Sequence, residues 1–136
     1  MSFHIEVVTP ERMIYSGEAV SVIAPGAEGD FGVLAHHLPM VVSLGVGELS
    51  IREASGRTVW MALEGGFFEV SDNKAIVLAD GAELASDIDV NRAHAALERA
   101  RHALEELEIT TVNRELARAA LARAEARLKA AADAKG

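Results

Sequence analysis

The chain is 136 residues long, half of its residues are hydrophobic, it contains no cysteine, and its formal net charge is −8. This hydrophobic content excludes general disorder, and no apolar run approaches the about 20 residues that a membrane-spanning helix needs. Residues 1–81 carry eleven acidic side chains against four basic ones, so this part lacks the basic surface on which nucleic-acid binding depends. The first residues contain neither a basic segment nor the apolar stretch of a secretion signal, and we therefore expect a folded cytoplasmic protein.

Glycine and proline are distributed very unevenly along the chain. Residues 1–81 hold all three prolines and ten of the eleven glycines, whereas residues 82–135 contain neither. Closely spaced turn formers between β-branched runs favour short strands, while a long segment rich in Ala, Leu, Glu and Arg favours continuous helix. The sequence therefore predicts two units, a β domain at 1–85 and a helical domain at 86–136.

Six segments of the first unit alternate between apolar and polar residues, as half-buried strands do. Compositions typical of hairpin turns lie between some of them, at residues 54–56 and 71–74. Strands at this spacing predict an antiparallel sandwich or barrel, and the frequent glycines indicate tight turns, bulges or close approaches of another backbone. The expected strands cover residues 3–8, 20–24, 49–53, 58–63, 67–70 and 75–79.

The second unit carries two hydrophobic seams with the a/d spacing of packed helices. Ser86 and Asp89 have the spacing of a capping box, which predicts a helix start at this point. Residues 109–113 separate the seams and have poor helix propensity without any Gly or Pro, so this linker can turn but nothing forces it to turn. A turn gives an antiparallel hairpin of helices about 35 Å long, and a continuous helix gives a rod of about 70 Å. The seams are Ala93, Leu97, Ala100, Leu104 and Leu107, followed by Ala117, Leu121, Ala124, Leu128 and Ala131.

Sequence motifs for catalysis are absent from the chain. It contains no glycine-rich phosphate loop, no nucleophile elbow and no cysteine nucleophile, and its five histidines show no metal-ligand spacing. We therefore expect neither a catalytic residue nor a metal site.

Two charged clusters are candidates for binding. The first is the glycine-rich loop 24–34, from which Glu28 and Asp30 project, and its alternative interpretation is a solvated acidic turn. The second cluster consists of arginines spaced along both helices, Arg92, Arg99, Arg123 and Arg127. In a hairpin their guanidinium groups could converge on a polyphosphate. The alternative is a surface ladder of ion pairs such as Glu125 with Lys129.

An ordered set of motifs along the whole chain resembles the epsilon subunit family of bacterial F-type ATP synthases, whose mitochondrial counterpart is called delta. The motifs are Ser16-Gly17-Glu18, the Pro-Gly-x-x-Gly-x-x-Gly-Val-Leu loop from Pro25 to Leu34, His37-Leu38-Pro39, Gly65-Gly66-Phe67-Phe68-Glu69-Val70 and Ile88-Asp89-x-x-Arg92-Ala93. This resemblance implies a flattened antiparallel β-sandwich of about ten strands, followed by a C-terminal two-helix antiparallel hairpin.

The resemblance implies a rotor subunit of the central stalk with no active site of its own. Such a subunit couples rotation of the membrane c-ring to ATP synthesis in the alpha/beta catalytic head, and it is peripheral to the cytoplasmic face of the bacterial inner membrane. In the family, the β domain binds the gamma subunit and the polar loops of the c-ring, and Glu28, Asp30 and His37 match the positions that face the ring. One departure is Ala35-His36 before His37, where relatives usually carry Pro-Gly, which predicts a different loop shape.

The helical domain is the regulatory element of the family, which in its extended form blocks rotation in the hydrolysis direction. The resemblance implies that the basic second helix meets acidic loops of the catalytic beta subunits through Arg114, Arg118, Arg123, Arg127 and Lys129. The family's ATP-binding signature matches at Ile88, Asp89, Arg92 and Ala93, and accessory positions match at Glu83, Arg99, Arg123 and Arg127. ATP is therefore implied as a regulatory ligand, and no cofactor is required.

Two other functions remain open from the residues alone. The first is an independent protein-binding module whose helices form an intermolecular coiled coil, because a/d periodicity does not distinguish an internal hairpin from a zipper between chains. The second is a small nucleotide-sensing protein outside any synthase, which would need the arginines but not the acidic loop. The ordered glycine motifs favour the ATP synthase subunit.

Overall fold

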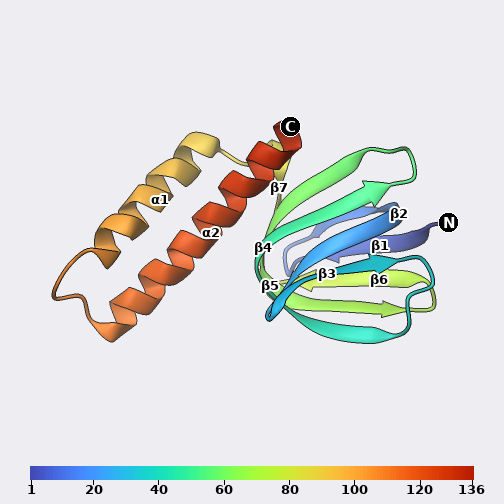
Figure 1. The fold of residues 1–136 in the computed structure, drawn as a ribbon, viewed down its shortest axis with the longest axis horizontal. Coiled ribbons are helices and arrows are strands. Elements are labelled where there is room, and N and C mark those ends of the chain that lie inside the picture. Colours follow the sequence, from blue (N-terminus) through green and yellow to red (C-terminus); the bar gives the residue numbers. More distant parts are fainter.

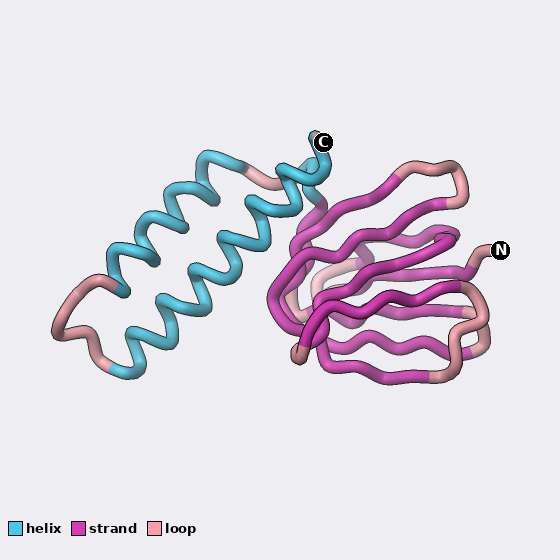
Figure 2. Tube along the Cα trace, in the orientation of Figure 1, coloured by secondary structure: helices cyan, strands magenta, loops and turns pink.

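The computed structural model describes residues 1–136 and consists of a β domain followed by two packed antiparallel helices, α1 and α2 (Figure 1). A short 3-10 turn, η1 (Ala85–Asp87), links the β domain to the helices. The tip of the helical hairpin points away from the β domain, as the tube in Figure 2 shows. The strands are β1 (Phe3–Val8), β2 (Met13–Gly26), β3 (Gly29–Leu34), β4 (Met40–Glu53), β5 (Thr58–Ser71), β6 (Lys74–Ala79) and β7 (Ala82–Leu84), and the helices are α1 (Val90–Leu104) and α2 (Thr111–Lys135).

Five strands of the β domain close on themselves as a barrel. The strand order is β1-β6-β5-β4-β2-β3, and β1 also pairs with β2, which closes the ring and leaves β3 as an edge strand. The expectation of a purely antiparallel sheet was wrong at one pair, because β1 and β6 run parallel. A parallel pair needs a long connection, and here residues 9–73 provide it.

The domain has seven strands where about ten were predicted. The reason is that β2, β4 and β5 are each 14 residues long. In addition, β5 pairs with two different strands along one of its edges. Its residues 61–63 pair with β7, and its residues 66–71 pair with β6. The predicted strands 58–63 and 67–70 are therefore two halves of β5, joined through Gly65 and Gly66.

The Gly65-Gly66 pair allows β5 to continue through its change of partner. Both residues have positive φ, 80° and 118°, in a region that side-chain-bearing residues rarely adopt. A Cβ atom on Gly66 would lie 2.0 Å from the carbonyl oxygen of Leu78 on β6. The expectation that some glycines mark a close approach of another backbone is confirmed at this position.

The core of the β domain is one cluster of 18 buried residues. It contains no residue of α1 or α2, so the barrel buries its own core and the helices pack outside it. The ring of Phe31 meets the ring of Phe68 edge to face, with centroids 5.2 Å apart, an arrangement that aromatic pairs favour. The largest fully buried side chains are Phe3, Phe68, Ile5, Leu49, Ile51, Met61 and Leu63.

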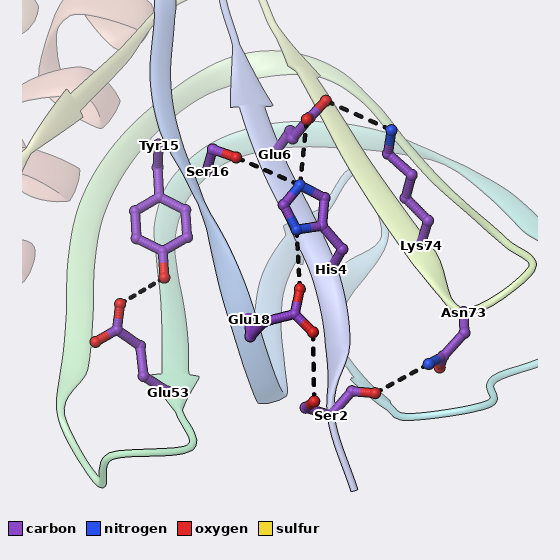
Figure 3. Close-up of polar contacts among 9 residues, drawn as sticks. All are labelled: Ser2, His4, Glu6, Tyr15, Ser16, Glu18, Glu53, Asn73 and Lys74. Carbon is purple, nitrogen blue, oxygen red and sulfur yellow. Dashed lines mark hydrogen bonds and ion pairs between the residues drawn. The ribbon is translucent and has the colours of Figure 1, made fainter.

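Polar side chains connect the strands on the outer surface around His4 (Figure 3). The His4 ring lies between two carboxylates, with Nδ1 2.9 Å from Glu18 on β2 and Nε2 3.2 Å from Glu6 on β1. These hydrogen bonds, first to Glu18 and then to Glu6, raise the pKa of His4 above 6.5 because they stabilise the protonated ring. Lys74 on β6 reaches Glu6 at 3.8 Å, so the cluster spans β2, β1 and β6.

Each helix begins at a side-chain cap. The Asp89 carboxylate accepts a hydrogen bond of 3.1 Å from the backbone N–H of Arg92 at the start of α1, and Thr110 caps α2 through the N–H of Asn113, also at 3.1 Å. Ser86 was predicted to open the helix, but it lies in η1. The predicted linker 109–113 was also displaced. The turn covers residues 105–110, with Thr110 as the N-cap, and α2 begins at Thr111. A threonine at the N-cap satisfies a free backbone donor, which outweighs the weak helix propensity of residues 111–113.

The two helices pack against each other as a hairpin. Ala93, Leu97 and Ala100 are buried on α1, and the α2 seam positions Ala117, Ala124 and Ala131 are also buried. Leu107 does not belong to the seam as predicted, since α1 ends at Leu104 and the Leu107 side chain is 99% exposed. The other seam leucines, Leu104, Leu121 and Leu128, are half-buried. Leu97, with only 7% exposure, is therefore the one large seam side chain that is fully enclosed.

Neither helix is both long enough and apolar enough to cross a membrane.

Candidate functional site

The second helix rests on the β domain through small side chains. Ala126 and Ala130 of α2 pack with Ala62 of β5, and Ile88 closes the cluster from the segment before α1. This cluster has five buried members and is separate from the barrel core. Alanine buries little apolar surface compared with Leu or Phe, so the apolar part of the contact between α2 and the β domain is weak.

Ion pairs flank this alanine contact on both sides. Arg123 Nε lies 3.5 Å from Glu64, while Arg127 places Nε 2.9 Å from Glu83 and Nη2 3.8 Å from Glu64. On the other side, Lys129 Nζ lies 2.9 Å from Glu48 of β4. The predicted pair of Glu125 with Lys129 does not form, because Lys129 contacts Glu48 and, at 2.9 Å, Asp133. These three cations of α2 therefore face carboxylates of the β domain.

The Glu48 carboxylate is the most enclosed member of these pairs, with a side chain only 11% exposed. Burial, and then the neighbouring carboxylate of Asp133, raises the pKa of Glu48, while the interactions with Glu48 and with the Lys129 ammonium lower the pKa of Asp133. The pKa of Lys129 is raised because Glu48 and then Asp133 accept its hydrogen bonds. Oε2 of Glu48 is buried without a hydrogen-bond partner. One ammonium group thus serves two carboxylates where the C-terminal half of α2 meets β4.

An arginine cleft of about 400 Å³ opens between the helices and β7. It brings together six of the eight residues for which ATP binding was predicted, Glu83, Asp89, Arg92, Ala93, Arg99 and Arg127. These residues come from β7, from α1 with its N-cap Asp89, and from α2, so only the hairpin assembles them. Asp87 also lines the cleft, so three guanidinium groups lie beside three carboxylates. Such a set can bind phosphate oxygens and, at the same time, donors such as an amino group or a hydroxyl.

The other two predicted residues lie beside the cleft. Arg123 lines a second groove of about 570 Å³ between the helices, together with Arg99 and Arg127. Ile88 is buried against the alanines of α2. Arg99 and Arg127 thus connect the cleft to the groove, and all four predicted arginines line one continuous region of the hairpin.

The residues predicted to face the c-ring lie along the edge strand β3. Glu28 is in the turn before this strand, Asp30 is its second residue, and His37 follows its far end. Both acidic side chains are exposed, and His37 is half-buried with Nδ1 2.7 Å from the carbonyl oxygen of Leu38. The three residues therefore occupy the two ends of one edge strand. His36 stands where the resemblance to the family places a glycine, and its φ of 62° lies in the left-handed region that favours glycine.

The basic residues predicted to contact the catalytic beta subunits fall into two groups. Arg114 and Arg118 lie near the hairpin tip and are exposed, and Arg118 pairs only with Glu115 within the helix, at 3.4 Å. Arg123, Arg127 and Lys129 are paired with the β domain as described above. In the hairpin, only the two arginines near the tip form no ion pair with the β domain.

An exposed apolar face was missed by the sequence analysis. Val41, Phe67 and Leu78 are 67%, 52% and 45% exposed, and they share one outer face because Phe67 pairs with Leu78 and with Ser43, two residues beyond Val41. The signal was that neighbouring residues on these strands, such as Phe67 and Phe68, are both apolar. Exposed apolar faces of this kind often mark protein interfaces.

Comparison with known proteins connects both parts of the structure to one family. The beta-sandwich domain of the ATP synthase delta/epsilon chain matches residues 2–85, and the long alpha-helix domain of the same chain matches residues 86–132. The ATP synthase epsilon chain of Nitratidesulfovibrio vulgaris strain DP4 is 45% identical over 128 residues, which cover 94% of each chain. That of Syntrophomonas wolfei is 46% identical over 129 residues, covering 95% of this chain and 93% of the relative.

Two solved structures of mitochondrial ATP synthases contain chains with the same fold. A chain in the Euglena gracilis OSCP/F1/c-ring structure matches with a TM-score of 0.84 and 25% identity, covering 96% of this chain and 81% of that chain. A chain in the central stalk/c-ring structure of Tetrahymena thermophila matches in fold, with a TM-score of 0.61 and 16% identity over 94% of this chain and 95% of that chain. With matches that extend over both the barrel and the hairpin, the chain belongs to the delta/epsilon chain family of ATP synthase.

Proposed function

We propose that the protein is a non-catalytic central-stalk subunit of a bacterial F-type ATP synthase, coupling c-ring rotation to ATP synthesis in the alpha/beta head. The observation that carries this proposal is family membership over the whole chain, with 45% identity to an epsilon chain. The protein would be peripheral to the cytoplasmic face of the inner membrane and would contact the membrane only through the complex. Coupling to protons is part of the proposal.

The β domain offers two distinct surfaces for its proposed partners. The edge strand β3, with Glu28, Asp30 and His37, is proposed to meet the polar loops of the c-ring. The apolar face around Val41, Phe67 and Leu78 is proposed to bind the gamma subunit, because a permanent partner is expected to cover exposed apolar side chains.

Charge reversal at Glu28 and Asp30 tests the c-ring surface. Both side chains are exposed, so replacing both with lysine is expected to change the free energy of unfolding by no more than about 0.5 kcal/mol per site. Reversed charge at an interface disturbs association, and we expect slower proton-driven ATP synthesis in reconstituted enzyme. The control reverses Glu105 and Glu106, which are exposed in the loop after α1. Equal synthesis rates for the two double variants would contradict the assignment.

The helical domain is proposed to inhibit ATP hydrolysis in its extended form, when its two helices separate and leave the β domain. Its apolar contact with the domain consists mainly of alanines, and its arginine pairs join side chains that are partly exposed, although Glu48, the partner of Lys129, is nearly buried. Exposed pairs contribute only about 0.2–1 kcal/mol each. This weak contact supports a helical arm that detaches at low cost, while the barrel keeps its own core.

Detachment would also uncover positive charge. Arg123, Arg127 and Lys129 are neutralised by Glu64, Glu83 and Glu48 in the docked hairpin. In an extended arm these three cations would join Arg114 and Arg118 and face acidic loops of the catalytic beta subunits. The docked state thus withholds three of the five cations proposed for the inhibitory contact.

Reconstitution with a catalytic head that lacks this subunit tests the inhibition. Adding the full chain is expected to slow ATP hydrolysis. Adding a chain that lacks residues 87–136 is expected to give faster hydrolysis than adding the full chain. The truncated chain retains the barrel core, and its binding to the head is checked by co-purification. Equal hydrolysis rates with both chains, each bound, would contradict an inhibitory arm.

ATP is proposed to stabilise the compact hairpin. A triphosphate in the arginine cleft would contact Arg92 and Arg99 of α1 and Arg127 of α2 at the same time. A ligand that binds one conformation preferentially shifts the population toward it, so ATP would relieve inhibition when it is plentiful. Asp89 or Glu83 would accept hydrogen bonds from the adenine or the ribose.

Loss of Arg92 and Arg99 tests this sensing. Charged hydrogen bonds contribute about 1.5–3 kcal/mol each, so replacing both residues with glutamine is expected to weaken ATP binding at least about tenfold. The control is Arg101→Gln, because Arg101 is exposed on α1 and pairs only with Glu98 at 3.5 Å. Isothermal titration with Mg-free ATP is the measurement. If wild type binds no ATP up to several millimolar, the arginines have no sensing role.

A dimerisation module remains the weaker alternative. Both hydrophobic seams already pack against each other inside one chain, which leaves no unpaired a/d seam for a zipper between chains.

A further inference from the structure

Glu64 of β5 faces the arginines of α2 from the side opposite the cleft. Its Oε1 atom lies 3.5 Å from Arg123 Nε and 3.8 Å from Arg127 Nη2. Glu64 lines a recess between β5 and α2 that also contains both arginines, and it does not line the arginine cleft. Arg127 lines both spaces, so one guanidinium group contacts Glu64 on one side and faces the cleft on the other.

The position of the Glu64 carboxylate depends on a glycine. A Cβ atom on Gly81 would lie 2.4 Å from Glu64 Oε2 and 3.2 Å from its Cδ. The backbone of Gly81 is outside the left-handed region, so its conformation does not require glycine. Glycine is required because a side chain would collide with the Glu64 carboxylate. The two residues are also joined by a hydrogen bond of 2.9 Å from the N–H of Glu64 to the carbonyl oxygen of Gly81.

We propose that Glu64 is an internal competitor for the anionic ligand of the arginine cleft. In the ligand-free protein its carboxylate neutralises Arg123 and Arg127 and holds α2 on β5. A triphosphate in the cleft must draw Arg127 away from Glu64, so Glu64 lowers the affinity for the ligand. The inference rests on the ATP sensing proposed above and adds a residue that does not touch the ligand.

This competition changes what ligand binding does to the structure. The triphosphate joins α1 to α2 through Arg92, Arg99 and Arg127, but it takes Arg127 away from Glu64. Binding therefore tightens the hairpin and, at the same time, loosens one contact between α2 and the β domain. Glu83 differs from Glu64 because it lines the cleft itself and lies 2.9 Å from Arg127 Nε.

Two variants remove the competitor in different ways. Glu64→Gln removes its charge and keeps its size. Gly81→Ala keeps the charge but displaces the carboxylate, since the added methyl group occupies the position of Oε2. Glu69→Gln is the control, because Glu69 lies on the same strand, is exposed and forms no ion pair. Glu69→Gln changes the net charge by the same amount as Glu64→Gln. Glu69 lies five residues from Glu64 along the strand, or about 17 Å, which is beyond the Debye length of about 8 Å.

Two measurements on the full chain test the proposal. By isothermal titration, Glu64→Gln and Gly81→Ala are expected to bind ATP about two- to fivefold more tightly than wild type, the range typical of exposed ion pairs. By hydrogen exchange without ligand, amides around residues 123–131 of α2 are expected to exchange about two- to fivefold faster in the same variants. Glu69→Gln is expected to match wild type in both measurements.

The outcomes separate this proposal from the sensing on which it rests. If wild type binds ATP and Glu64→Gln binds no more tightly, the competitor is overturned while ATP sensing stands. If no variant binds ATP up to several millimolar, both are overturned. Unchanged hydrogen exchange in Glu64→Gln would overturn the role of Glu64 in holding α2 on β5.

Discussion

Replacing Gly66 with alanine is expected to lower the free energy of unfolding of the β domain by about 3–5 kcal/mol, because steric overlap adds to backbone strain. Gly66 has a φ of 118°, and its Cβ would lie 2.0 Å from the Leu78 carbonyl oxygen and 2.8 Å from the Cα of Ala79. Both obstacles are backbone atoms of β6, which cannot move without breaking the pairing of β5 with β6. Urea unfolding followed by the fluorescence of Trp60, the single tryptophan of the chain, is the measurement.

Gly56 provides a matched control for this substitution. It also has a positive φ, 94°, but no atom lies within 4 Å of the position that its Cβ would take. Gly56→Ala is therefore expected to cost only the backbone penalty of about 1–2 kcal/mol. If the two alanine variants were equally stable, the close approach of β6 to Gly66 would be wrong.

Local sequence signals predicted the elements of the fold well where those elements depend on neighbouring residues. Alternation placed strands at 3–8 and 75–79, in agreement with β1 and β6 up to one residue. The absence of Gly and Pro from residues 82–135 predicted the helices. The family motif at Gly65-Gly66 coincides with the place where β5 changes its partner strand, a position at which only glycine fits.

Features that depend on distant residues could not be predicted in the same way. The parallel pairing of β1 with β6 joins segments about 70 residues apart in the chain, and no local pattern encodes it. The number of strands depended on whether 14-residue segments bend or break. The choice between hairpin and rod was open because residues 109–113 favour neither state strongly, and the position of the Thr110 cap decided where the turn lies.

The candidate site was predicted in part. Helical spacing and the family motif selected arginines that the hairpin does bring to one region. The carboxylates of β4 and β5 that pair with cations of α2 were missed, since Glu48, which pairs with Lys129, and Glu64, which pairs with Arg123, belong to strands whose contact with α2 has no sequence signature. The exposed apolar face was missed because alternation assigns one face of a strand to the core and says nothing of a second apolar face.

In the helical domain, one buried leucine stabilises the compact hairpin. Leu97 is 7% exposed and is the large side chain enclosed between α1 and α2, so Leu97→Ala is expected to destabilise the hairpin by about 2–4 kcal/mol. Leu104, predicted as an equal member of the seam, is half-buried and should cost less. The β domain should keep its stability, because its core contains no helix residue.

A loss of about 2–4 kcal/mol corresponds to a shift of roughly 30-fold or more in the equilibrium between the compact hairpin and the extended arm, in which α1 and α2 are separated. The extended arm is the proposed inhibitory form, so Leu97→Ala is expected to inhibit ATP hydrolysis more strongly than wild type in a reconstituted catalytic head, and ATP should relieve this inhibition less effectively. Leu107→Ala is the control, because its side chain is 99% exposed in the hairpin and has no packing to lose. Weaker inhibition by Leu97→Ala, with the variant still bound to the head, would mean that the compact hairpin is itself the inhibitory form.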